Sequence, residues 1–246
     1  MTGHDWIQPD WPAPIGVRAL STTRRGGVSR APFNDLNLGA NVGDVCEDVS
    51  ANRASLLREA GLPESPRWLS QVHSSRVIPA NQVRGAPEAD ASWTRNPDVV
   101  CAVLTADCLP VLMCDDAGAV VAAAHGGWRG LVHGVLENTV RAMAVDGTHL
   151  MAWIGPGIGP SRFEVGEDVL LAFERADQDC GGCFVATRPG HWLADLAGLA
   201  ERRLRAVGVE RVFHATGCTH SEPERFFSYR RDGRTGRMAS LIWRTL

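Results

Sequence analysis

The middle of the chain constrains the fold most strongly, because it holds three short apolar runs that are typical of buried strands. The first run covers residues 99–104, and the other two cover residues 111–114 and 119–124. Asp115-Asp116-Ala117-Gly118 separates the second run from the third and predicts a four-residue hairpin turn. An antiparallel strand pair is therefore expected at the centre of the fold.

The remaining elements do not follow a regular strand–helix–strand alternation. Helices are predicted at about 49–60, from 131 onward, at 166–176 and at 193–207, and strands at 68–78, 150–154, 211–216 and 238–243. This irregular order predicts an α+β fold, layered and with mixed sheets, rather than a doubly wound dinucleotide-binding fold. The sequence has no internal repeat or low-complexity linker, so we expect a single domain over residues 1–246.

All 25 basic side chains are arginine, and this excludes several kinds of chemistry. Without lysine the chain cannot form a Schiff base with a substrate or pyridoxal phosphate. The lysine-containing phosphate loop and the protein-kinase strand lysine are excluded for the same reason. Any bound anion must therefore be held by arginine, histidine, backbone N–H groups or a metal ion.

The charge balance and the hydropathy pattern limit the choice of partners. The formal net charge is −3, which does not suggest binding to nucleic acid. The N-terminus has no apolar signal region, and no apolar run approaches the roughly 20 residues that a membrane span needs. We therefore expect a cytoplasmic protein without a membrane partner, whose seven cysteines are reduced.

The predicted hairpin brings a cysteine and a histidine together. If Cys114 lies opposite Ala119, then Cys108 lies opposite His125 on the same face, with Cβ atoms roughly 5 Å apart. That spacing suits two ligands of one metal ion, although Pro110 could interrupt the strand pairing before Cys108. The alternative interpretation is a buried cysteine beside a structural histidine.

A third ligand would complete a catalytic metal site. His73, at the end of a separate predicted strand, is the candidate, but its spacing alone would not select it among the eight histidines. Two histidines and one cysteine would bind Zn²⁺ and leave the fourth position open for water or substrate.

Several local sequences select one interpretation, because together they resemble the YfiH family, also called the laccase-domain or peptidoglycan-editing-factor family. The resemblance spans the chain in order and is carried by Thr22-Thr23-Arg24-Arg25-Gly26-Gly27, Asn37-Leu38-Gly39-Ala40-Asn41-Val42-Gly43-Asp44, Gln71-Val72-His73, Thr105-Ala106-Asp107-Cys108-Leu109-Pro110, Ala124-His125-Gly126-Gly127-Trp128-Arg129-Gly130, Ile154-Gly155-Pro156-Gly157-Ile158-Gly159-Pro160, Phe226-Phe227-Ser228-Tyr229-Arg230-Arg231-Asp232-Gly233 and Thr235-Gly236-Arg237-Met238-Ala239. Gly126 departs from the alanine that is common in the family.

The resemblance implies a fold and an activity. The implied fold is an α/β/β/α sandwich related to the catalytic domain of cytotoxic necrotizing factor. The implied activity is zinc-dependent phosphorolysis of adenosine, inosine, guanosine and methylthioadenosine, together with deamination of adenosine. The zinc ligands of the family fall on His73, Cys108 and His125, and Cu²⁺ can occupy such a site in vitro because it binds these ligands more tightly than zinc.

Further residues in these motifs become candidates for the active site. Cys108 and His125 are expected to take part in catalysis, and Asp107 is expected to act as acid/base or as a hydrogen-bonding partner of a histidine ligand. The expected substrate-binding residues, which would contact purine nucleoside and phosphate, are Arg24, Arg25, Asn41, Gln71, Arg129, Tyr229 and Arg230. Arg129 follows two glycines at a predicted helix start, where anions are favoured. Each arginine has a structural salt bridge as its alternative, and the expected assembly is a monomer or small homo-oligomer.

Other functions remain open at this point. A cytoplasmic hydrolase that edits peptidoglycan precursors could use Cys108 as nucleophile or a zinc-activated water, and a structural zinc site would make the protein a binding module. A copper-dependent polyphenol oxidase is a weaker alternative, because the sequence has no H-x-H pair. Cys180-Gly181-Gly182-Cys183 is interpreted as an incidental surface pair, and His220-Ser221-Glu222 lacks the P-C-x-x-C of nucleobase deaminases.

Overall fold

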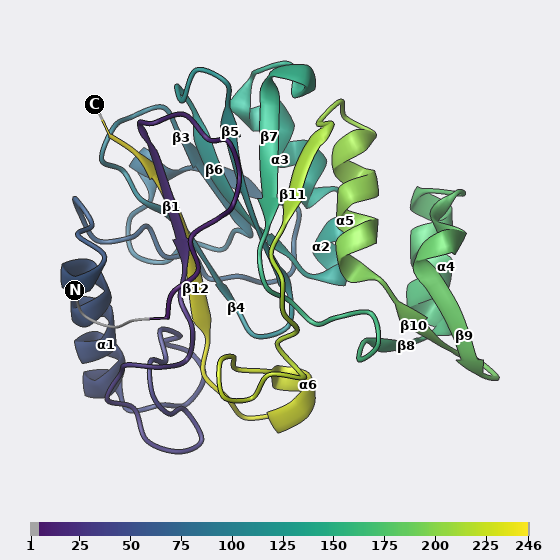
Figure 1. Cartoon of the computed structure of the whole chain (residues 1–246), viewed down its shortest axis with the longest axis horizontal. Coiled ribbons are helices and arrows are strands. Elements are labelled where there is room, and N and C mark those ends of the chain that lie inside the picture. The colour runs from purple at the N-terminus through teal and green to yellow at the C-terminus, as the bar shows by residue number, and fades with distance from the viewer. Residues whose placement is uncertain (1–4, 246) are drawn as a thin grey trace.

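The fold has four layers, which Figure 1 shows from one side. We describe residues 5–245 of a computed structural model. Helix α1 (Cys46–Glu59) covers the outer face of a three-stranded front sheet, and the inner face of that sheet packs on a six-stranded large sheet. Helices α2, α3 and α5 cover the far face of the large sheet. The predicted α/β/β/α sandwich with mixed sheets is therefore confirmed.

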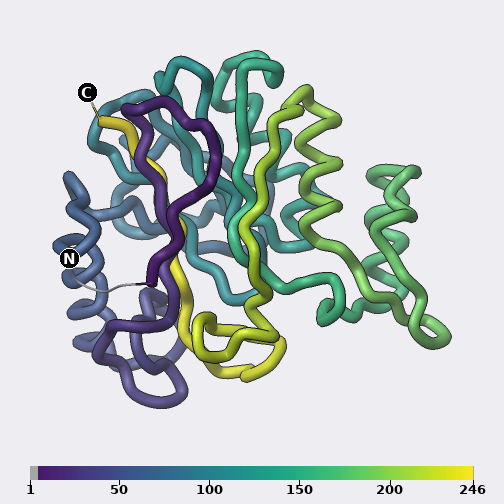
Figure 2. The backbone as a smooth tube through the Cα atoms, viewed as in Figure 1, coloured from purple at the N-terminus to yellow at the C-terminus, as the bar shows by residue number. Residues whose placement is uncertain are grey.

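The front sheet joins strands that lie far apart in the sequence. Its order is β1-β12-β4, with bounds Val17–Ser21, Met238–Arg244 and Cys101–Thr105, and both pairs are antiparallel. Figure 2 shows β1, near the purple end of the chain, running alongside the yellow β12.

The large sheet contains the predicted hairpin at its centre. Its order is β11-β7-β5-β6-β3-β2. The bounds are Val77–Pro79 for β2, Ala91–Thr94 for β3, Leu109–Asp115 for β5, Val121–Gly126 for β6, Leu150–Ile154 for β7 and Arg211–His214 for β11. The pairs β11–β7 and β2–β3 are parallel and the others antiparallel, so the sheet is mixed.

Strand β5 is apolar because it is buried on both faces. Val111 and Met113 point into the core beneath the helices, whereas Leu112 and Cys114 point into the core between the two sheets. Successive side chains of a strand point to opposite faces, so a strand between two cores needs apolar residues at both its odd and its even positions. A third core lies between α1 and the front sheet.

The helical layer is joined by a small sheet at one side of the molecule. Helices α2 (Trp128–Val132), α3 (Val135–Met143) and α5 (Leu196–Arg205) pack on the large sheet. Helix α4 (Glu167–Ala176) packs beside the small sheet, which is ordered β8-β10-β9. Its strands are Glu164–Gly166, His191–Ala194 and Phe184–Arg188, and the short helix α6 (Tyr229–Asp232) precedes β12. Three 3₁₀ helices cover Ala80–Gln82, Gly147–His149 and Cys180–Cys183.

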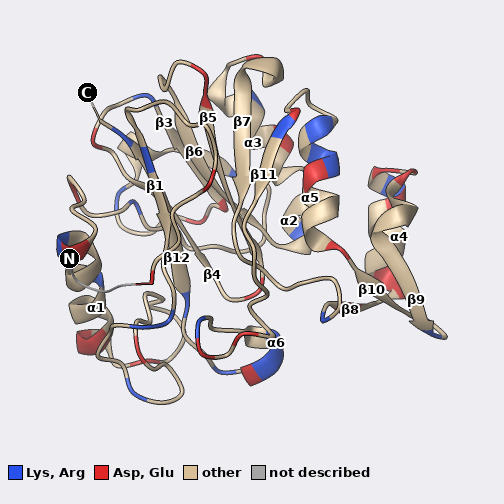
Figure 3. Ribbon diagram, in the orientation of Figure 1, with Lys and Arg blue, Asp and Glu red and all other residues tan. Residues whose placement is uncertain are grey.

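Charged side chains lie mainly on helices and loops. Figure 3 shows the strands of the large sheet almost free of charge, while α5 and α6 carry clusters of arginine and acidic residues. Within residues 5–245, no helix has the length and apolar character required for a membrane crossing.

Four local predictions were wrong. The helix expected from 131 onward is two helices, because Gly134 adopts a left-handed backbone with φ of 85° between them. The first residues of the helix expected at 193–207 belong to β10. Of the strand expected at 68–78, only residues 77–78 lie in a strand, β2. Cys180 and Cys183 were expected to form a surface pair, but Cys180 is fully buried.

Candidate metal and active site

The hairpin differs from the predicted register by two residues. Pro110 pairs with His125, and Cys114 pairs with Val121 rather than Ala119. The turn is longer than expected because the Asp115 carboxylate accepts hydrogen bonds from the backbone N–H groups of Ala119 at 2.7 Å and Val120 at 3.0 Å. A shift of two residues leaves each side chain on the same face of the sheet. Cys108, just before β5, therefore still lies near His125 as predicted, but diagonally across the pair.

His73 reaches the same place from a loop. Its backbone has φ of 60°, a left-handed conformation that is uncommon outside glycine. The Asp90 carboxylate holds this loop by accepting the backbone N–H groups of His73 at 3.0 Å and Ser74 at 2.7 Å, as well as the Ser74 hydroxyl at 2.7 Å. The strain at His73 is therefore stabilised by a buried anion.

Asp90 also fixes the orientation of the second histidine. His125 Nδ1 lies 2.8 Å from Asp90 Oδ1, and the His125 backbone N–H donates to the Asp90 carbonyl at 2.7 Å. An ionised carboxylate can only accept, so Nδ1 carries a proton, and in the neutral ring Nε2 is the nitrogen that keeps a lone pair for a metal ion. The contacts to His125 and Ser74 lower the pKa of Asp90 to about 2 despite its burial, which favours the neutral acid.

The three predicted ligands form a group that could hold a metal ion. The donor atoms of His73, Cys108 and His125 all lie within 4.8 Å of one another, and Cys108 Sγ is 3.7 Å from His73 Nε2. Two such atoms on a tetrahedral zinc ion would be about 3.6 Å apart, given Zn–N near 2.1 Å and Zn–S near 2.3 Å. Within residues 5–245, no other histidine, cysteine or carboxylate joins this group. The donor set therefore fits zinc with its fourth position open.

Without a metal ion, the cysteine and the buried histidine form a charged pair. Burial disfavours the Cys108 thiolate, but the charge and hydrogen bond of His125 outweigh burial and lower the Cys108 pKa to about 6. Burial likewise disfavours the His125 cation, but Cys108 and Asp90 raise its pKa to about 9. A thiolate at neutral pH is the form that binds a metal ion.

Two glycine positions allow the backbone to pack closely around the ligands. A Cβ atom on Gly127 would lie 2.6 Å from His73 Cδ2 and 3.1 Å from Cys108 Sγ. A Cβ atom on Gly157 would lie 2.5 Å from Leu109 Cδ2 and 3.0 Å from the Asp107 carbonyl oxygen. The proline-containing loop 155–160 thus supports the segment that carries Cys108.

Asp107 does not contact a histidine ligand. Its Oδ1 accepts the Thr219 hydroxyl at 2.6 Å, and its Oδ2 accepts the Arg230 backbone N–H at 2.6 Å. The carboxylate that binds a histidine ligand is Asp90 instead. Asp107 itself has φ of 98°, so the residue before the cysteine ligand also has an unusual backbone.

Three of the predicted substrate-binding residues hold parts of the backbone together. Arg24 donates to the carbonyls of Asn34 and Pro223, and Arg25 donates to the carbonyl of Glu224. Both ends of the Gln71 side-chain amide bond to the backbone of Leu104, at 2.8 and 2.7 Å.

The other four predicted residues are exposed. The Arg129 guanidinium lies over the Trp128 ring, and Arg230 Nη1 donates to the Glu164 carbonyl. Tyr229 is 61% exposed, and Asn41 lies in the turn that follows Gly39.

Sequence reasoning missed two residues next to the site, Asp90 and Arg237. A signal for Asp90 was available, because a histidine metal ligand usually donates its second ring N–H to a carboxylate. The sequence did not indicate which of the many carboxylates this would be. Arg237 was part of a recognised motif, but its position relative to Cys108 depends on the pairing of β12 with β4.

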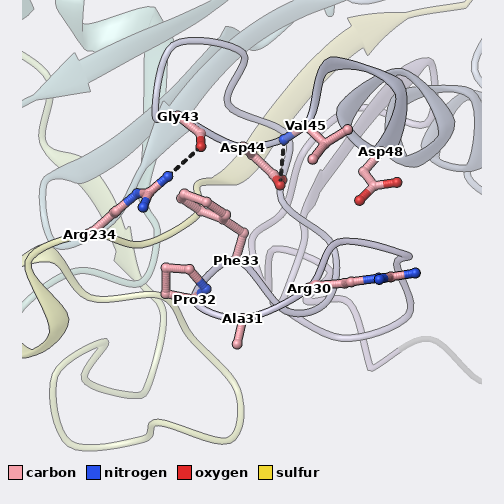
Figure 4. Close-up of a pocket in the computed structure, with 9 residues that line it drawn as sticks. All are labelled: Arg30, Ala31, Pro32, Phe33, Gly43, Asp44, Val45, Asp48 and Arg234. Carbon is pink, nitrogen blue, oxygen red and sulfur yellow. Dashed lines mark hydrogen bonds between the residues drawn. The ribbon is translucent and has the colours of Figure 1, made fainter.

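A separate pocket of about 390 Å³ is shown in Figure 4. Its lining includes Phe33, Asp48 and Arg234, and Arg234 Nη2 donates to the Gly43 carbonyl at 2.7 Å. None of the three predicted metal ligands lines this pocket.

Comparison with known proteins gives consistent matches over nearly the whole chain. The family model described as multi-copper polyphenol oxidoreductase laccase matches residues 18–245. A Pseudomonas aeruginosa protein named purine nucleoside phosphorylase is 52% identical over 97% of this chain and 98% of its own length. An Escherichia coli protein named purine nucleoside phosphorylase YfiH is 51% identical over 96% of this chain and 98% of its own.

Solved structures share the fold. A crystal structure of a Neisseria meningitidis protein matches with a TM-score of 0.95 and 49% identity, covering 98% of this chain and 100% of that chain. The crystal structure of YlmD from Geobacillus stearothermophilus matches with a TM-score of 0.93 and 30% identity, covering 100% of this chain and 98% of that chain.

Proposed function

This chain belongs to the YfiH family, whose model is described as multi-copper polyphenol oxidoreductase laccase, and from that premise we propose that it is a zinc-dependent purine nucleoside phosphorylase. The proposed substrates are adenosine, inosine, guanosine and methylthioadenosine, and adenosine is also deaminated. The observation that carries the proposal is the group of three donor atoms on His73, Cys108 and His125, with a fourth position open. Relatives about half identical to this chain that are named purine nucleoside phosphorylase support the choice of reaction.

The protein side chains would prepare the site for the metal ion. His73, Cys108 and His125 would bind zinc, which supplies a Lewis acid at the open position when bound. Asp90 keeps the proton of His125 on Nδ1, so that Nε2 remains a donor atom for the metal.

Phosphorolysis forms a bond between a phosphate oxygen and C1′ of the ribose and breaks the bond from C1′ to the purine nitrogen. The leaving base takes the bonding electrons and must gain a proton. Asp107, beside Cys108 in the sequence, is the candidate acid, and to supply this proton it must first be protonated and give up one of the two hydrogen bonds that its oxygens accept from Thr219 and Arg230. The exposed ring of Tyr229 offers a flat face for the purine, because aromatic rings pack favourably in offset stacks.

A nucleoside assay tests this function. Wild-type protein with measured zinc content should release hypoxanthine from inosine only when phosphate is present. Cys108→Ala should lose both zinc and activity, whereas Cys46→Ala, at an exposed cysteine on α1, should keep both. Release of ammonia from adenosine should not require phosphate. Full zinc content and full phosphorylase activity in Cys108→Ala would contradict the proposal.

A second candidate function is supported by the low pKa of Cys108. A thiolate with a pKa of about 6 beside His125 could attack an amide carbonyl as a nucleophile, as an editing hydrolase for peptidoglycan precursors would require. Release of an amino acid from a muropeptide precursor by metal-free protein, without phosphate, would favour this function. For copper-dependent polyphenol oxidation, the described residues provide one donor group, and the sequence has no H-x-H pair.

A further inference from the structure

The proposed phosphorolysis requires a site for phosphate, and the chain has only arginine side chains to provide a permanent positive charge. Two of the arginines selected from the sequence, Arg24 and Arg25, use their guanidinium groups to bind backbone carbonyls on loops. The following inference rests on the proposed function, because it asks which arginine would hold the attacking phosphate.

Arg237 lies beside the segment that carries the cysteine ligand. Strand β12 begins at Met238, which pairs with Thr105 at the end of β4. Arg237 and Ala106 extend these two antiparallel strands by one residue each, so the backbone of Arg237 lies next to the turn formed by Asp107 and Cys108. The pairing of two distant strands thus brings the backbone of this arginine beside the segment that carries Cys108.

The backbone of Arg237 is held in place by a buried asparagine. The Arg237 N–H donates to Asn37 Oδ1 at 2.9 Å, and the Arg237 carbonyl accepts the Leu38 N–H at 3.1 Å. Gly39 leaves room for the side chain, because a Cβ atom there would lie 2.8 Å from Arg237 Cγ. These hydrogen bonds fix the backbone of Arg237, and the close contact with Gly39 sets the direction in which its side chain extends.

Half of the Arg237 guanidinium is used inside the protein and half is free. Nη1 donates to the carbonyls of Thr235 and Gly236, each at 2.9 Å, which uses both of its protons. Among residues 5–245, no hydrogen bond or ion pair involves Nε or Nη2. Neither atom is among the buried polar atoms that lack a partner, so both retain access to solvent. These two nitrogens form one edge of the guanidinium, with two donors suited to a bidentate oxyanion.

The electrostatic surroundings connect Arg237 to the site. Burial lowers its pKa, while the charges of Cys108, Asp107 and Tyr229 act in the opposite direction. Arg237 also lies over the Tyr229 ring, with 5.9 Å from Cζ to the ring centroid. The arginine therefore lies within electrostatic range of Asp107 and Cys108 and against the exposed tyrosine that is proposed to contact the purine.

We propose that the free Nε and Nη2 edge of Arg237 binds inorganic phosphate and presents it to the ribose. A half-buried guanidinium with one edge already fixed loses little side-chain freedom when it binds, and a planar pair of donors matches two phosphate oxygens. Arg237 thus takes the role that sequence reasoning gave to Arg129, Arg24, Arg25 or Arg230.

Arg234 provides a matched control three residues away. It also lies over an aromatic ring, that of Phe33, with 5.0 Å from Cζ to the ring centroid. It also donates to a backbone carbonyl, but it is exposed and lines the separate pocket of Figure 4. Replacing it removes the same charge from the same loop.

The first measurement is phosphate binding by equilibrium dialysis with radiolabelled phosphate, on zinc-loaded proteins of measured metal content. Wild type and Arg234→Met should bind phosphate, and Arg237→Met should bind it at least about tenfold more weakly. Arg237→Lys should be intermediate, because it keeps the charge without the paired donors. If Arg237→Met does not fold, weaker binding by Arg237→Lys decides the question. Binding equal to wild type in a folded Arg237 variant, or no binding by wild type, overturns the inference.

The second measurement separates this inference from the proposed function. In inosine phosphorolysis, Arg237→Met should raise the phosphate KM by at least about tenfold while the inosine KM stays within about twofold of wild type. A wild-type protein that binds phosphate through Arg237 but releases no base from any nucleoside would support this inference and refute the proposed function. A variant with a raised inosine KM and an unchanged phosphate KM would refute the inference alone.

Discussion

Replacing Asp90 with asparagine tests the idea that one buried carboxylate assembles the metal site. The carboxylate accepts hydrogen bonds from the loop at Val72, His73 and Ser74 and from the ring of His125. Asparagine keeps the shape but turns one oxygen into a donor, which must then face one of these donors. If it faces His125, the ring proton moves from Nδ1 to Nε2 and blocks the atom that would bind the metal.

The expected size follows from the pKa of Asp90 and from the loss of the histidine's partner. A folded-state pKa of about 2 against an ordinary 3.8 corresponds to about 2 kcal/mol of stability. Because the folded pKa is depressed, this stability is present above pH 4 and is lost as the pH falls toward 2. Loss of the carboxylate partner of a histidine ligand typically weakens metal binding by about 10- to 100-fold.

The assays are chemical denaturation of metal-free protein at pH 7 and pH 3, and zinc titration against a competing chelator. Asp115→Asn is the control, because Asp115 is also buried and accepts two backbone N–H groups, but in the hairpin turn. Both N–H groups bond to Oδ1, which the amide oxygen of asparagine can replace, so this variant should leave zinc affinity unchanged. The reasoning fails if Asp90→Asn binds zinc as tightly as wild type, or if Asp115→Asn loses as much zinc affinity.

Three other predictions concern the ligands themselves. Cys108→Ser should reduce the zinc content of purified protein to well below one ion per chain, measured by elemental analysis, because the thiolate donor is lost; stoichiometric zinc would contradict this. Gly127→Ala should weaken zinc binding by about tenfold or more, since the added methyl group displaces His73 and Cys108. Gly181→Ala is the control and should not change zinc binding, because a Cβ atom there meets no atom within 4 Å. Equal zinc affinities in the two variants would refute this prediction. In metal-free protein, the rate of alkylation of Cys108 by iodoacetamide should reach half of its maximum near pH 6, because the pKa of this thiol is lowered to about 6. A half-maximal rate near pH 9 would show that His125 does not stabilise the thiolate.

The sequence predicted those parts of the fold that depend on local patterns. The central hairpin, helices α1 and α4, and strands β7 and β12 were placed within a few residues, since apolar periodicity and glycine stops act locally. The helix break at Gly134 was missed, because an isolated glycine in a helical pattern is often tolerated. The division of the strands between two sheets came from the family resemblance and not from periodicity.

In the candidate site, too, local sequence patterns predicted some residues and missed others. Pairing arithmetic brought Cys108 and His125 together even though the register was wrong by two residues, because facing depends only on parity. His73 came from a motif, since its loop is placed by the carboxylate of Asp90. Asp90 and Arg237 depend on contacts between segments far apart in the sequence, which no local pattern encodes.

The order of these segments along the chain has a consequence for biosynthesis. His73, Asp90, Cys108 and His125 are all synthesised in the first part of the chain, whereas β12 follows more than a hundred residues later. We expect a ribosome-bound chain that stops before Arg237 to carry every proposed metal ligand but neither the central strand of the front sheet nor the proposed phosphate arginine. The proposed metal ligands are therefore synthesised well before the strand that joins β1 to β4 and brings the proposed phosphate arginine to them.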